Sequence, residues 1–320
     1  MLMLYDLLMK VNGTFAAFVS MGCTFLISFL SIVYFKGILP KDQGREFAVN
    51  GALSEGKPRG AGIIFVTTFT LCTALFVPLD FENILYLVFI YGAMMSGYLD
   101  DAAEVPWGNL KKGLIDFIIA IGTAVTYYVY NGSDIRVFIF DIKIHIPMVL
   151  FVILGAVLVW TAINVTNCTD GVDGLCATLV MIVIAVLMFS GLFRVSDRLL
   201  LTVMLITLGS YLWFNCSPSM LLMGDAGSRA LGVFLAVMFL KSQAPFLFIP
   251  FALVVILDGG LGLLKVSFIR FLKLKNFMKN IRTPLHDHVR KNKGWSDTQV
   301  VMRFSLIQIL CSMLYLSFIR

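Results

Sequence analysis

The sequence predicts an all-α polytopic membrane protein with about ten transmembrane helices, organised as one domain over residues 1–320. Hydrophobic residues make up 59% of the chain and charged residues only 14%, whereas soluble domains carry roughly 25% charged residues. The chain also contains repeated apolar runs whose length is close to the roughly 20 residues that a helix needs to cross the hydrocarbon core. The opening MLMLYDLLMK lacks a small-residue cleavage site, so we expect no cleavable signal peptide.

Ten apolar segments are predicted to be membrane helices, and the eighth is short for a span. They cover residues 14–35, 61–78, 83–99, 113–130, 147–165, 175–193, 199–214, 229–241, 246–269 and 300–319. Pro245 fits a turn before the ninth segment, which is long enough to tilt or bend. The 6 cysteines are scattered without metal-ligand spacing and are interpreted as small buried hydrophobic residues.

Two connections are predicted to carry structure of their own. Residues from Asp134 to Pro147 alternate apolar and polar side chains and are rich in β-branched residues, which predicts a short β-hairpin on the outer face. His145 in this hairpin is interpreted as a surface residue. The basic loop from Arg270 to Ser296 is predicted to contain a short interfacial helix and to border the functional region, because such long loops are often functional.

The distribution of positive charge predicts the orientation in the membrane. Most of the 25 Lys and Arg residues lie in connections that follow odd-numbered segments, and such connections remain in the cytoplasm. Both termini are therefore expected outside. This bias and anionic lipid headgroups explain the formal net charge of +6, and no nucleic-acid-binding motif is present.

Acidic and imidazole side chains gather in the same predicted cytoplasmic loops. They follow the third, fifth, seventh and ninth segments and are, in chain order, Asp100, Asp101, Asn167, Asp170, Asp173, Asp225, His286 and His288. Adjacent carboxylates at a membrane boundary are costly when dry, and a divalent cation or a neighbouring lysine removes that cost. Carboxylates beside imidazoles and cations therefore predict a metal-assisted phosphate site.

Three local patterns refine this prediction. The turn Asp170-Gly-Val-Asp-Gly174 includes Gly171 and lets the backbone approach a ligand closely, which suits ribose hydroxyls or a base edge as well as a metal. Asp225 lies between two glycines near a helix start, where hard carboxylate oxygens suit Mg²⁺. His286 and His288 suit phosphate binding or proton handling near neutral pH.

Two further acids lie inside predicted spans. Asp116 and Asp258 are functional candidates because intramembrane acids are costly. For Asp258, packing against a partner such as Lys265 is an equally good interpretation.

Several stretches resemble the polyprenyl-phosphate N-acetylhexosamine-1-phosphate transferase superfamily. They are Lys57–Gly62, Leu99–Asp101, Asn164–Leu175, Leu212–Asn215, Met223–Ser228, Pro284–His288 and Lys293–Trp295. The stretches Leu212–Asn215 (LWFN) and Lys293–Trp295 (KGW) favour the phospho-N-acetylmuramoyl-pentapeptide transferase branch over the N-acetylglucosamine branch.

The resemblance implies a bacterial plasma-membrane enzyme that transfers phospho-MurNAc-pentapeptide from UDP-MurNAc-pentapeptide to undecaprenyl phosphate, giving lipid I and UMP in peptidoglycan synthesis. It implies Asp225 as the ligand of a Mg²⁺ cofactor, with Asp100, Asp101 and His286 also catalytic. The implied substrate-binding residues are Asn167, Asp170, Gly171, Asp173, Asn215 and His288. Relatives also suggest a homodimer.

The sequence departs from the family pattern at several positions. Asp287 replaces the central residue of a triple-His run, and Leu222 stands where relatives have an aromatic that stacks on uracil. Lys57-Pro-Arg59 replaces Thr-Pro-Thr, Ser54 replaces a common lysine, and a basic residue usual near Asp116 is missing. These changes bear on sugar and nucleotide specificity.

The sequence leaves alternatives open. A related UDP-sugar such as UDP-GlcNAc is the alternative donor. An ion-coupled transporter is a more distant alternative, since transporters place polar groups near the bilayer midplane rather than at helix ends. For the mechanism, we expect direct in-line attack by undecaprenyl phosphate with Asp100 taking any residual proton. A covalent aspartyl-phosphate is the alternative.

Overall fold

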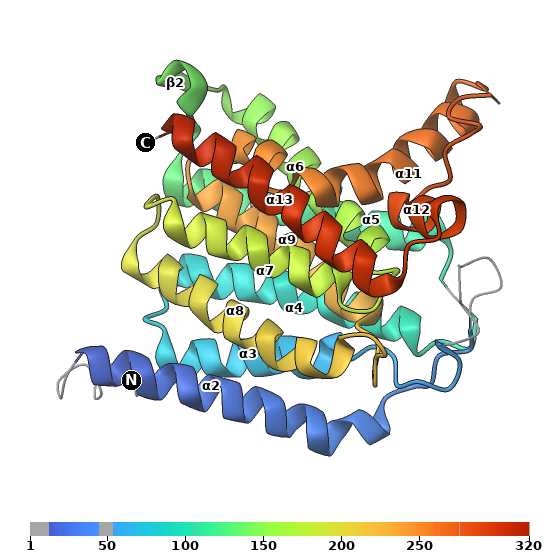
Figure 1. The fold of residues 1–320 in the computed structure, drawn as a ribbon. Coiled ribbons are helices and arrows are strands. Elements are labelled where there is room, and N and C mark those ends of the chain that lie inside the picture. The colour runs from blue at the N-terminus through green and yellow to red at the C-terminus, as the bar shows by residue number, and fades with distance from the viewer. Residues whose placement is uncertain (1–12, 45–53, 106, 275, 320) are drawn as a thin grey trace.

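A computed structural model describes residues 13–44, 54–105, 107–274 and 276–319. The opening segment, on which the expectation about a signal peptide rests, lies outside these residues. Within the described chain the protein is helical, with one two-stranded sheet. The long helices run side by side as a bundle (Figure 1).

Helices form in every one of the predicted apolar segments. They are α2 (Gly13–Phe35), α3 (Gly62–Phe76), α4 (Phe81–Asp101), α5 (Asn109–Asn131), α6 (Met148–Thr169), α7 (Leu175–Phe189), α8 (Val195–Asn215), α9 (Gly224–Lys241), α10 (Phe248–Phe251) with α11 (Leu253–Phe271), and α13 (Asp297–Ile319). The helix predicted within the basic loop is α12 (Leu285–Lys293), and short 3-10 turns are η1 (Lys36–Ile38), η3 (Phe138–Phe140) and η4 (Pro245–Leu247).

The prediction of ten membrane spans is supported only in part. By length and composition, 5 helices among the described residues are able to cross a membrane, namely α2 (with η1), α5, α6, α8 and α13. The bent pair α10 and α11 makes up to 6 when it is counted as one span. The helices α3 and α7 have 15 residues each and are short, and the polar ends of α4 and α9 lower their apolar character.

The ninth predicted segment is sharply bent. The axes of α10 and α11 differ by 92°, and the break falls at Ala252. Pro245 begins the turn η4, as its position in the sequence predicts. The helix α11 consequently leaves the bundle and points away from it, carrying the chain toward α12 (Figure 1).

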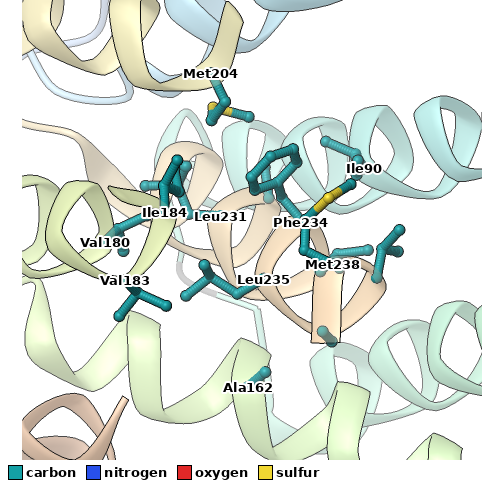
Figure 2. Close-up of a cluster of buried hydrophobic side chains, with 14 of the residues drawn as sticks. Ile90, Ala162, Val180, Val183, Ile184, Met204, Leu231, Phe234, Leu235 and Met238 are labelled. Atoms are coloured by element: carbon teal, nitrogen blue, oxygen red, sulfur yellow. The ribbon is translucent and has the colours of Figure 1, made fainter. Parts of the chain in front are cut away.

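The helix α9 forms the centre of the hydrophobic core and is buried along almost its whole length. Figure 2 shows its side chains Leu231, Phe234, Leu235 and Met238 among side chains of the surrounding helices. These neighbours include Ile90, Ala162, Val180, Val183, Ile184 and Met204. Because α9 is surrounded by protein, the residues at its first turn are held in a fixed place.

The predicted hairpin is confirmed. Strands β1 (Asp134–Val137) and β2 (Ile142–His145) pair in antiparallel register, with Asp134 opposite His145. The backbone N–H of Arg136 donates to the carbonyl of Gln243 at 2.7 Å, which joins the hairpin to the turn after α9. The hairpin, the start of α2 and the end of α13 lie at one end of the bundle, and α12 lies at the other (Figure 1).

A buried ion cluster fixes the hairpin end of α9. Lys241 Nζ lies 3.0 Å from Asp197 Oδ1 and 3.4 Å from Glu82 Oε2, and it donates to Asn83 Oδ1 at 3.1 Å. Asn131 also donates to Glu82 at 2.7 Å. The single lysine therefore offsets two buried carboxylates from α4 and α8.

Lys241→Met is expected to lower the free energy of unfolding by about 3–5 kcal/mol, because two buried carboxylates lose their cation. Thermal unfolding of the purified protein in detergent measures this change. Lys143→Met, on the exposed strand β2, is the matched control and should have little effect. Equal melting temperatures for the two variants would contradict the role of the cluster.

Candidate active site

The acidic ends of two neighbouring helices meet at the end of the bundle opposite the hairpin. Asp100 and Asp101 are the last residues of α4, and Asp225 lies in the first turn of α9. The carboxylate of Asp101 accepts a hydrogen bond from the backbone N–H of Ala226, with 3.2 Å between N and Oδ2. This bond joins the two helices, so the three predicted carboxylates lie together.

Two cations bridge these carboxylates. The guanidinium of Arg59 donates from Nε to Asp101 Oδ1 at 2.9 Å, and its Nη2 lies 3.8 Å from Asp225 Oδ1. The Nζ of Lys112 pairs with Asp100 and lies 3.6 Å from Asp225 Oδ2. Each cation therefore connects Asp225 to one carboxylate of α4 and offsets their mutual repulsion.

Arg59 has a third carboxylate partner in the loop before α3. Its Nη1 donates to Asp42 Oδ1 at 3.0 Å, and the hydroxyl of Ser54 donates to the other oxygen of Asp42 at 2.7 Å. Burial opposes the charge of the guanidinium, but Asp101, Asp225 and Asp42 outweigh it and raise the pKa of Arg59. Arg59 is therefore a permanent cation at the centre of the cluster.

The pKa values of Asp101 and Asp225 shift in opposite directions, and both residues lie just outside the predicted spans. Burial, followed by the negative charge of Asp225, raises the pKa of Asp101 to about 6. Burial also opposes ionisation of Asp225, but Lys112 and the Asn167 amide outweigh it and lower its pKa. Asp225 is thus the carboxylate that stays ionised across the neutral range, as a cation ligand requires.

A cavity of about 610 Å³ lies beside the carboxylates. Arg59 and Gly224 line it and connect it to Asp101 and Asp225. The predicted site residues that also line it are Asn167, Asp170, Gly171, Asp173, Asn215 and His286. The structure therefore brings together side chains from four loops. Each of these loops follows an odd-numbered apolar segment, so the sequence predicts that they lie at the same end of the bundle.

Two predicted polar residues that line the cavity contact residues of other elements. Asn167 Nδ2 donates to the hydroxyl of Ser228 on α9 at 3.1 Å. Asp173 Oδ2 accepts from the backbone N–H of Ser219 at 2.9 Å and lies 3.8 Å from the Nζ of Lys57. The first contact joins α6 to α9, and the second fixes the loop after α6 against the loop before α9.

Asn215 lines the cavity, but its amide is occupied by the two loops. Its Oδ1 accepts from the backbone N–H of Gly174 at 3.0 Å, and its Nδ2 donates to the carbonyl of Leu221 at 2.9 Å. Asn215 therefore supports the shape of the site, and its polar atoms face protein partners.

The two predicted histidines have different surroundings. His286 on α12 lines the cavity. His288 does not line it, because its Nδ1 accepts from the backbone N–H of Arg282 at 3.2 Å, in the connection before α12. The spacing of two residues turns the side chains toward different sides of the short helix.

The alternative that pairs Asp258 with Lys265 is wrong. Lys265 Nζ donates to the carbonyl of Ile281 at 2.7 Å, and Asp258 accepts hydrogen bonds from His286. Asp258 and His286 are far apart in sequence and lie on different helices. They meet because the bend before α11 carries this helix to α12, which no local sequence signal predicts.

The other intramembrane acid has a buried partner. Asp116 on α5 pairs with Arg229 on α9, and the two side chains are 6% and 3% exposed. Arg229 thus supplies a cation beside α5, where the sequence lacks the basic residue usual in the family.

Most of the departures from the family pattern line the cavity, namely Ser54, Lys57, Arg59, Leu222 and Asp287. Arg59, which replaces a threonine of the family, is one of the two cations that contact the clustered carboxylates. Asp287 Oδ1 lies 3.5 Å from Arg290 Nη1, and its Oδ2 lies 3.7 Å from Arg282 Nε.

The sequence did not predict Lys112 as a partner of the carboxylates. The one available signal was its position in the first turn of α5, directly after the connection that follows Asp101.

The donor groups of the cluster fit a magnesium ion that is shared with a substrate. Asp225 is 17% exposed, and the two cations beside it lie beyond ordinary hydrogen-bond distance at 3.6 and 3.8 Å. No group of three or more His, Cys, Asp or Glu residues in the described chain is arranged to hold a metal. Mg²⁺ usually takes one or two protein carboxylates and completes its shell with water and phosphate oxygens, so this arrangement fits it.

Comparison with known proteins gives consistent matches. The Glycosyl transferase family 4 profile matches residues 83–243. A phospho-N-acetylmuramoyl-pentapeptide-transferase of Treponema pallidum (strain Nichols) is 40% identical over 294 residues, which cover 84% of this chain and 80% of the relative. The chain belongs to the phospho-N-acetylmuramoyl-pentapeptide transferase family. More distant members are similar too, among them one from Wolbachia (strain wRi) at 27% identity, covering 92% of this chain and 97% of the relative.

Membership in the phospho-N-acetylmuramoyl-pentapeptide transferase family confirms the family predicted from the motifs, and with it that the chain is a phosphotransferase. The profile covers α4 to α9 and therefore includes all three clustered carboxylates. His286 and the rest of α12 lie beyond its end. A relative from Bartonella quintana, 28% identical over 295 residues, covers 83% of this chain.

Proposed function

We propose that this chain transfers phospho-MurNAc-pentapeptide from UDP-MurNAc-pentapeptide to undecaprenyl phosphate, releasing UMP and forming lipid I for peptidoglycan synthesis. One observation carries the proposal beyond family membership. Asp100, Asp101 and Asp225 meet at the end of two helices, beside a polar cavity of about 610 Å³ that is large enough for a nucleotide sugar.

The cluster supplies what a phosphate transfer needs. Asp225 would hold Mg²⁺, which neutralises charge on the diphosphate when it is bound. Arg59 and Lys112 are the protein's own cations at the same place and attract the anionic donor and acceptor to it. Asn167 and the 170–173 turn line the neighbouring space, which we assign to the nucleoside and sugar.

The surroundings of Asp100 favour direct attack by the lipid phosphate. Asp100 Oδ1 accepts from the backbone N–H of Trp107 at 2.7 Å, and Oδ2 pairs with Lys112. Each oxygen has a partner, so attack by either one to form a covalent aspartyl intermediate would require that oxygen to lose its partner. A second lone pair on either oxygen can take a residual proton from the acceptor phosphate while both partners stay in place.

The test of this function is a release assay with purified protein. Undecaprenyl phosphate and Mg²⁺ are supplied with either UDP-MurNAc-pentapeptide or UDP-GlcNAc, and UMP is measured. UMP is expected from the muramoyl donor. Release only from UDP-GlcNAc would overturn the donor assignment, and no UMP from either donor would overturn the transferase function of this chain.

Leu222 gives a separate test of where uracil binds. It lines the cavity and is fixed by backbone bonds to Pro58 and Ala61 at 2.8 and 3.0 Å. Leu222→Phe is expected to lower the KM for the UDP donor by about tenfold, because stacking on an aromatic ring stabilises a base by about 1–3 kcal/mol. Met220→Phe, an exposed residue of the same loop, is the control. An unchanged or higher KM for Leu222→Phe would show that uracil does not bind beside residue 222.

The family and the apolar helices place the protein in a bacterial membrane, and we propose that the cavity faces the cytoplasm with both termini outside. The excess of Lys and Arg in the loops around the cavity supports this orientation. Cys216 is an exposed thiol in the loop before α9. A maleimide that does not cross membranes should label it in inside-out vesicles only, and labelling from the opposite side would reverse the orientation. The homodimer suggested by relatives stays a prediction, which native mass spectrometry tests.

A further inference from the structure

The carboxylate of Asp258 contacts His286 twice. Its Oδ1 accepts from the backbone N–H of His286 at 2.8 Å, and its Oδ2 lies 2.8 Å from the ring Nδ1. Asp258 is 0% exposed and His286 is 3% exposed, so water does not compete for either contact. Two short contacts between the same residues fix both the position of the helix α12 and the orientation of the ring.

This contact also determines which ring nitrogen carries the proton. An ionised carboxylate only accepts hydrogen bonds, so Nδ1 must be the donor and carry the hydrogen. The lone pair of the neutral ring is then at Nε2, on the opposite edge. Aspartate–histidine pairs in other enzymes hold an imidazole in one tautomer in the same way.

The other edge of the ring faces the loop after α6. A Cβ added to Gly171 would lie 2.3 Å from His286 Nε2, so only glycine lets the loop and the ring approach this closely. Gly171 and His286 both line the cavity. Asp287 Oδ1 lies 3.9 Å from Nε2, which is beyond hydrogen-bond distance.

We propose that Asp258 is a positioning residue that fixes His286 as the Nδ1–H tautomer, so that Nε2 presents its lone pair to the donor substrate in the cavity. The neutral ring then accepts a hydrogen bond at Nε2 from a hydroxyl group of the donor. A ring that has taken up a proton at Nε2 from solvent donates to a phosphate oxygen instead. This inference rests on the proposed function for its substrate, but the tautomer itself can be measured without turnover.

The chain has 3 histidines, which makes a direct measurement practical. Nitrogen-15 NMR of histidine-labelled protein distinguishes a ring nitrogen that carries a hydrogen from one that does not. His286 is expected as the Nδ1–H form. His288 is the internal control, since its Nδ1 accepts from a backbone N–H and its hydrogen must be on Nε2 when the ring is neutral. Spectra of His286→Gln and His145→Gln assign the signals.

Asp258→Asn tests the assigned tautomer of His286, because the substitution should reverse which ring nitrogen carries the hydrogen. The asparagine oxygen can still accept from the His286 backbone N–H, and its NH₂ then donates to Nδ1, which moves the ring hydrogen to Nε2. The variant keeps both contacts and nearly the same shape. His286 should change to the Nε2–H form, and kcat should fall by about 10²-fold with a smaller change in KM.

A double-mutant comparison separates positioning from structure. In a His286→Gln background, Asp258→Asn is expected to lower kcat no further, because the ring on which Asp258 acts is already absent. Asp258→Ala removes the contact and leaves the tautomer unfixed. If wild-type His286 is already the Nε2–H form, or if Asp258→Asn changes the tautomer while kcat is unchanged, the proposal is overturned. UMP release by the wild-type protein tests the transferase function independently.

Discussion

Asp225→Asn is expected to reduce kcat for UMP release by roughly 10³-fold, since the substitution removes the charge that would hold Mg²⁺ against the diphosphate. Asp225 is the carboxylate whose pKa is lowered and which both Arg59 and Lys112 approach. The amide of asparagine keeps the size of the side chain, so the loss should come from charge. Steady-state kinetics over a range of Mg²⁺ concentrations measures it.

The control for this variant is Asp141→Asn, which changes a carboxylate that is 78% exposed in the hairpin. It should leave kcat unchanged. Thermal unfolding of Asp225→Asn should show a folded protein, because the substitution also removes a negative charge that raises the pKa of buried Asp101. Turnover within tenfold of wild type would show that Asp225 does not bind the essential metal.

Gly97→Ala is expected to lower kcat by about 10²-fold, although no reactive group is removed. A Cβ at Gly97 would lie 2.4 Å from the backbone carbonyl of Asp225, so α4 and α9 must move apart. That movement separates Asp100 and Asp101 from Asp225, and misplacement by about 1 Å is enough for such a loss. UMP release and thermal unfolding are measured together.

Gly92→Ala is the matched control on the same helix, because a Cβ there meets nothing within 4 Å. Alanine favours a helix over glycine, so this variant should be as stable as wild type or more so, with unchanged kcat. Wild-type turnover by Gly97→Ala would show that the carboxylates tolerate separation of the two helices.

The sequence predicted which loops share the site because hydropathy and charge alternate with each crossing. Asp100, Asp170 and Asp225 each follow an apolar segment of the same parity, and this alone places them at one end of the bundle. The hairpin from Asp134 to His145 was predictable for a similar reason, since alternation and β-branching are local properties.

The partners within the site depend on contacts that local patterns do not contain. Arg59 contacts Asp101 and Asp225 because loops far apart in the sequence fold against each other. His286 meets Asp258 only because the chain bends by 92° at Ala252. A hydropathy pattern reports which residues are apolar but contains no information about the angle between two helices.

The enclosed position of α9 has a consequence for how the protein is made. This helix carries Asp225 and Arg229 in its first turns, and charged groups are costly to place in lipid. Five of the helices that pack against it, α3, α4, α5, α6 and α7, are synthesised before it. When α9 emerges from the ribosome, Asp116 is already in the membrane to receive Arg229. The order of helices along the chain is therefore also an order of assembly, in which this polar segment enters a space already formed by the helices before it.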